Sequence, residues 1–74
     1  MYKGGHMQFR LKDDFIKLGQ VLKAVHLCDS GLDAKIVIQN GLVKVNGEVD
    51  TRRGRKIVSG DVVEYDGNTV EITK

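Results

Sequence analysis

The sequence is poor in several residue types, and each shortage removes a class of structure. It has no proline and one cysteine, Cys28, so an internal disulfide is excluded. No apolar run approaches the roughly 20 residues of a membrane-spanning helix, and no apolar core of a secretion signal is present. We therefore expect a cytoplasmic protein without a membrane partner, in which Cys28 is a small buried hydrophobic residue beside Leu27.

Groups that support catalysis or bind metals are also scarce. His26 is the one histidine beyond residue 6, and we expect it near the C-terminal end of a first helix, where the helix dipole favours it. His26 and Cys28 lack a second pair of ligands, which argues against a zinc site. Asp13 and Asp14 are better explained as charge at a helix start. Without a glycine-rich phosphate loop, we expect no enzyme activity and no cofactor.

The length sets the domain organisation. The chain has 74 residues, and the small polar start with its His6-Met7 junction resembles an expression leader. We expect residues 1–6 to be that leader and residues 7–74 to form one domain. Because a domain of this size buries only about 60% of its unfolded surface, a deep enclosed active site is not expected.

Charge is distributed unevenly along the chain. Residues 7–34 carry four basic and four acidic side chains, which sum to zero. Residues 35–57 carry six basic and two acidic side chains, a net charge of +4, and residues 58–74 carry one basic and four acidic side chains, a net charge of −3. Four cations fall within the five residues 52–56. This run is either a solvated loop balanced by the acidic end of the chain, or a surface whose arginines bind phosphates in bidentate fashion.

The first half of the chain has mainly helical periodicity. Met7–Leu11 alternates as a short strand does. Asp13 or Asp14 is predicted to cap a first helix, within which Gly19 suggests a close helix–helix approach. The apolar face of that helix is expected to consist of Phe15, Leu18, Leu22 and Val25.

A second helix is predicted from about Gly31 to Asn40. Ser30 and Asp33 resemble a capping box at its start, and Gly41 suits the left-handed position after its end. The β-branched run 36–38 favours a strand instead, but the two caps decide for a helix.

Two hairpins follow. The first turns at Asn46-Gly47, and its return arm should be short because Val49 would oppose Lys44. The second joins 62–65 to 69–72, with Val63 opposite Val70. The sequence thus predicts an α+β fold, with two helices packed on a small antiparallel sheet of about four or five short strands.

The order of residues resembles that of the S-four RNA-binding domain, also called the alpha-L motif. The resemblance extends from about Phe15 to Tyr65 and points to the small stand-alone bacterial type regarded as ribosome-associated. The matching positions are Ser30, Ala34, Val37-Ile38, Gly41, Val43-Lys44-Val45-Asn46-Gly47 and Gly60-Asp61.

The resemblance implies a non-catalytic protein that binds structured RNA, ribosomal RNA first, and through it a ribosomal subunit. We expect it to be a monomer. Family members bind RNA across the two helices and the following strand and loop, which implicates Lys35, Lys44, Arg52, Arg53, Arg55 and Lys56. Asp33 lies where many relatives are basic, so no RNA contact is expected at the start of the second helix. Phe9, Phe15 and Tyr65 are expected in the core.

Two alternatives stay open. The first is a protein–protein adaptor on the translation machinery that uses the exposed edge at Ile36 or the acidic C-terminal hairpin. The second is a DNA-binding helix-turn-helix. Against it, the outward face of the second helix offers only Lys35 and Gln39 for reading bases.

Overall fold

The computed structural model describes residues 5–74, so most of the expected leader lies outside the described residues. Within these residues, seven strands and two helices follow one another: β1 (His6–Arg10), β2 (Ile16–Lys17), α1 (Leu18–Ala24), α2 (Gly31–Gln39), β3 (Val43–Val45), β4 (Glu48–Val49), β5 (Lys56–Ile57), β6 (Val62–Tyr65) and β7 (Asn68–Thr73). His6, assigned to the leader, is the first residue of β1.

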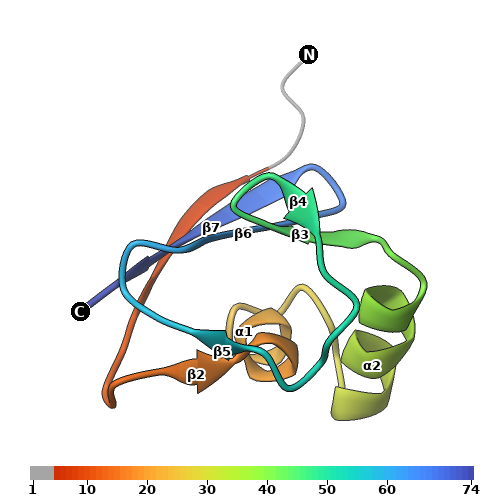
Figure 1. The fold of residues 1–74 in the computed structure, drawn as a ribbon, viewed down its shortest axis with the longest axis horizontal. Coiled ribbons are helices and arrows are strands. Elements are labelled where there is room, and N and C mark those ends of the chain that lie inside the picture. The colour runs from red at the N-terminus through yellow and green to blue at the C-terminus, as the bar shows by residue number, and fades with distance from the viewer. Residues whose placement is uncertain (1–4) are drawn as a thin grey trace.

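The predicted α+β class is confirmed, with two helices below a five-stranded sheet of order β1-β7-β6-β3-β4 (Figure 1). A second, two-stranded sheet pairs β2 with β5. The larger sheet is antiparallel except at one edge, where β1 runs parallel to β7 and makes the sheet mixed. Hairpin geometry dictates the direction of consecutive strands only, so it did not constrain this pair from opposite ends of the chain.

The core lies between the helices and the sheet. It consists of apolar side chains that both helices and the strands β3, β5, β6 and β7 contribute, together with Leu11 and Cys28. Burial of Cys28 as a small hydrophobic residue is thus confirmed. The fully buried members include Leu18, Val21, Leu22, Ala34, Ile38, Val43, Ile57, Val63 and Val70.

The predicted start of the first helix is wrong. Helix α1 begins at Leu18, and its N-cap residue, Lys17, makes no side-chain cap. Instead, the backbone amides of Leu18 and Gly19 donate to the carbonyl oxygens of Arg55 and Arg53, at 2.9 and 3.1 Å. Because a distant segment satisfies these free amides, no carboxylate from Asp13 or Asp14 is needed.

Two further predictions change with that boundary. Phe15 precedes α1, is 38% exposed and lies outside the core. His26 lies beyond the C-cap residue, Val25, in the left-handed conformation with φ 63°. Helices commonly end at a residue in the left-handed conformation, and histidine is one of the non-glycine residues that adopt this conformation more often than most.

The predictions from residue 30 onward are largely confirmed. The Ser30 hydroxyl accepts a hydrogen bond from the Asp33 amide at 3.2 Å, and the run 36–38 is helical. Gly41 follows α2 with φ 76°. In the hairpins Lys44 lies opposite Val49, and Val63 lies opposite Val70, as expected.

Candidate nucleic-acid interface

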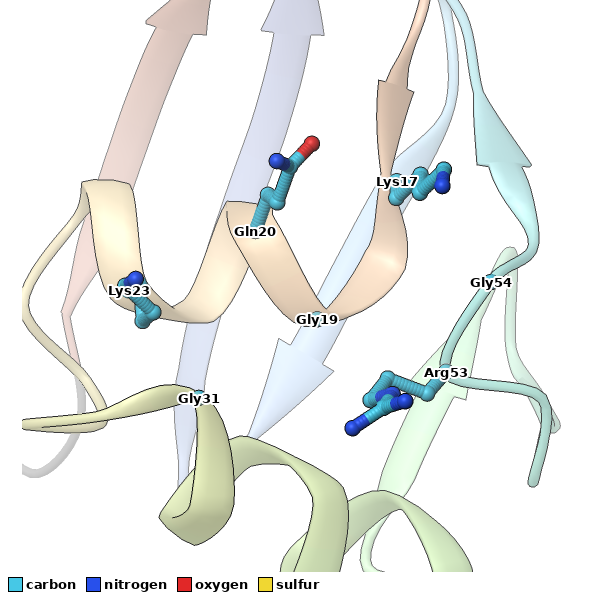
Figure 2. A pocket seen from close by; sticks show the side chains of 7 residues that line it. All are labelled: Lys17, Gly19, Gln20, Lys23, Gly31, Arg53 and Gly54. Atoms are coloured by element: carbon cyan, nitrogen blue, oxygen red, sulfur yellow. The ribbon is translucent and has the colours of Figure 1, made fainter.

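A hollow of about 340 Å³ opens between α1, the start of α2 and the segment 53–54 (Figure 2). We call it the basic hollow, because three of its lining residues are cations and none is a carboxylate. The lining residues are Lys17, Gly19, Gln20, Lys23, Gly31, Arg53 and Gly54. Positive charge without an opposing carboxylate favours an anionic ligand.

The backbone of α1 brings Arg53 into this hollow. A Cβ atom at position 19 would lie only 2.8 Å from Cγ of Arg53, so only glycine lets the two segments approach this closely. The close approach expected of Gly19 therefore exists, but its partner is the run of residues 52–56, called the basic segment below, and not another helix. Lys17, at the end of β2, and Lys23, on α1, also line the hollow.

A buried carboxylate holds the basic segment in place. The Asp50 side chain is 5% exposed. One of its oxygens accepts from the backbone amide of Arg52 at 2.9 Å and from Nε of Arg52 at 3.1 Å; the other accepts from Nη2 of Arg52 at 2.9 Å and from Nη1 of Arg55 at 2.8 Å. The Arg52 hydrogen bonds, aided by Arg55, hold the pKa of Asp50 well below its usual range although burial acts in the opposite direction.

The four cations of residues 52–56 consequently differ in their surroundings. Arg52 and Arg55 are paired with Asp50, although the Arg52 side chain stays 70% exposed. Nζ of Lys56 lies 4.9 Å from the centre of the Phe15 ring, a cation–π contact. Arg53 alone among them lines the basic hollow.

The other two predicted residues lie apart from it. Lys35 is half-buried on α2 and does not line the basic hollow. Lys44 is exposed on β3, directly opposite Glu64 of β6, and it lines a separate shallow hollow with Tyr65.

Sequence reasoning missed Lys17, Gln20 and Lys23. They occur in a stretch whose net charge is zero, so the charge distribution gave no signal. Their spacing of three residues was a usable signal, because it places side chains on one side of a helical segment. The structure also revises the reasoning about α2: Gly31 lines the basic hollow, whereas Asp33 lines a different one beside Cys28.

Residues 5–74 lack two further kinds of feature. They contain no group of three or more histidine, cysteine, aspartate or glutamate side chains placed to hold a metal ion. None of their helices has the length and apolar character needed to cross a membrane.

Comparison with known proteins identifies the family. Residues 9–73 match the S4 domain. The chain is 41% identical over 61 residues to the "Putative RNA-binding protein YbcJ" of Escherichia coli (strain K12), covering 82% of this chain and 87% of that protein. It is 48% identical over 54 residues to the "Probable ribosome maturation protein RlbA" of Bacillus subtilis (strain 168), covering 73% and 76%.

A solved structure agrees with this assignment. The solution structure of E. coli YbcJ, described as revealing an alpha-L motif involved in RNA binding, superimposes with a TM-score of 0.68 at 35% identity. The match covers 100% of this chain and 92% of that one. This protein therefore belongs to the S4 domain family.

Proposed function

We propose that this protein is a non-catalytic binder of folded RNA, ribosomal RNA first, and that the basic hollow receives phosphates of that RNA. The observation that carries the proposal is that Lys17, Lys23 and Arg53 all line one hollow that no carboxylate lines. The names of the relatives, RNA-binding and ribosome maturation proteins, support the same reading.

The binding mechanism is electrostatic and depends on a preformed surface. Lysine and arginine neutralise phosphates and release counterions, so the affinity should fall with salt. The guanidinium of Arg53 suits bidentate contact with a phosphate. Because Asp50 fixes the neighbouring arginines, little order has to be gained on binding. Arg52, Arg55 and Lys56 extend the positive surface along the same segment.

A salt series with two charge-matched variants tests the proposal. Lys17→Ala with Arg53→Ala removes two of the three cations that line the basic hollow, whereas Arg10→Ala with Lys74→Ala removes two exposed cations that do not line it. Binding to ribosomal RNA and to duplex DNA is followed by fluorescence anisotropy. We expect a preference for RNA. In a plot of log affinity against log salt concentration, the slope should become less steep by about 1.4–1.8 in the first variant only.

Equal losses in the two double variants would instead indicate a general affinity for polyanions. Absence of RNA binding by the wild type at low salt would refute the proposal. The adaptor alternative would then gain support, since Leu32 and Ile36, four residues apart on α2, are 64% and 48% exposed. Binding to RNase-treated ribosomal particles, lost in Leu32→Ser with Ile36→Ser, would establish it.

A further inference from the structure

A second hollow adjoins the basic hollow. It measures about 520 Å³ and shares the side chains of Gln20 and Lys23 with its neighbour. Phe9, Phe15 and Ile16 contribute an apolar wall, and Lys12 adds a further cation. We call it the aromatic hollow. Its volume lies within the range of sites that bind small organic groups.

Phe15 is the unusual member of this wall. It is 38% exposed, although a phenylalanine is normally buried, and it does not belong to the core. Lys56 lies over its ring, and Lys56 pairs across the small sheet with Lys17 of the basic hollow. An exposed aromatic ring beside phosphate-binding cations is the arrangement by which proteins stack unpaired bases.

We propose that the aromatic hollow receives an unpaired nucleobase of the RNA strand whose phosphate lies in the basic hollow. This inference rests on the proposed function. Gln20 and Lys23 line both hollows, so the two hollows adjoin. A ligand that reaches both would join an anionic group to a flat apolar one. A nucleotide has this composition, and a single-stranded or bulged nucleotide can leave its stack at little cost.

The polar side chains at the aromatic hollow suit the edge of a base. The Gln20 amide both donates and accepts hydrogen bonds. Asp13 also lines the hollow, and its carboxylate repels a phosphate but accepts from an exocyclic amino group. The basic hollow, which no carboxylate lines, thus favours the phosphate, and the apolar wall and Asp13 favour the base in the aromatic hollow.

Two RNA hairpins test the inference. They are identical except that one carries a single bulged 2-aminopurine nucleotide, whose fluorescence falls when it stacks on an aromatic ring. We expect the wild type to prefer the bulged hairpin roughly tenfold or more, from one base–aromatic stack, and to quench its fluorescence. Phe15→Leu should lose both the preference and the quenching while binding the unbulged hairpin normally; Phe15→Tyr should retain them.

The matched variant is Lys17→Ala with Arg53→Ala, which should weaken binding of both hairpins and leave their ratio unchanged. Equal wild-type affinity for the two hairpins, or an equal loss on both in Phe15→Leu, overturns the nucleobase site but leaves the proposed function standing, provided the double variant still weakens binding. If neither hairpin binds at low salt, the nucleobase site fails together with the proposed function.

Discussion

Asp50 is a negative residue at the centre of the most positive segment, and it gives that segment its shape. Its carboxylate accepts four hydrogen bonds from Arg52 and Arg55. The carbonyl oxygens of Arg53 and Arg55 meanwhile accept from the first amides of α1. A buried carboxylate therefore links the loop conformation to the position of Arg53, and its charge is compensated locally.

Replacing Asp50 by asparagine should lower the free energy of unfolding by about 1–3 kcal/mol, because buried hydrogen bonds to charged groups are lost. The fold lowers the pKa of Asp50, so its stabilising effect is present above the ordinary carboxyl pKa and disappears as the pH falls towards the lowered value. In urea unfolding, the difference between wild type and Asp50→Asn should shrink progressively below about pH 4.

The control for this measurement is Asp66→Asn, which removes one exposed carboxylate from the turn between β6 and β7. Its stability should follow that of the wild type within about 0.5 kcal/mol at neutral pH. A difference between wild type and Asp50→Asn that stays constant from pH 7 to pH 2 would mean that the ion pair does not contribute.

Gly19→Ala should weaken RNA binding without unfolding the protein. Alanine favours a helix by about 1 kcal/mol over glycine, but the new Cβ would lie 2.8 Å from Cγ of Arg53 and displace that side chain. We expect a several-fold loss of affinity by fluorescence anisotropy and no further loss when Arg53→Ala is added. Gly31→Ala is the control: it lines the same hollow, and its Cβ would meet nothing within 4 Å.

At the scale of elements, the sequence was most informative where the structure is local. The start and end of α2, the turn at Asn46-Gly47 and the register of Val63 with Val70 all depend on residues close in sequence, and all were predicted. The start of α1 depends instead on the pairing of Ile16 with Ile57, which lies 41 residues further along the chain. No pattern of neighbouring residues indicates such a pair, and Asp13 and Asp14 led to the wrong prediction because they are residue types that commonly cap helices.

Helix α2 is the element whose stability can be tested most directly. Ser30→Ala removes the hydroxyl that accepts from the Asp33 amide and should cost about 1 kcal/mol in urea unfolding. Ser30→Asp, another good cap, should retain most of the stability. Ser59→Ala is the control, since Ser59 is exposed and lies outside the helices and strands. A Ser30→Ala variant as stable as Ser59→Ala would show that this cap contributes little.

At the scale of the whole molecule, the fold mixes charges that the sequence keeps apart. The basic segment supplies one side chain to the basic hollow, Arg53, and the neutral first third supplies Lys17 and Lys23. Counting charges along the chain therefore found part of the candidate site. The remainder required knowing that β5 pairs with β2, which brings the basic segment beside α1.

This distribution predicts graded effects of single alanine substitutions on affinity for ribosomal RNA. Lys17→Ala and Arg53→Ala should each make the dependence of log affinity on log salt concentration less steep by about 0.7–0.9, the contribution of one phosphate contact. Lys35→Ala and Lys44→Ala should have smaller effects, because neither residue lines the basic hollow and Lys44 lies opposite the carboxylate of Glu64. Titrations at several salt concentrations separate the two groups. If Lys44→Ala changed the salt slope as much as Lys17→Ala does, the RNA-binding surface would extend from the helices over strands β3 and β6 of the sheet.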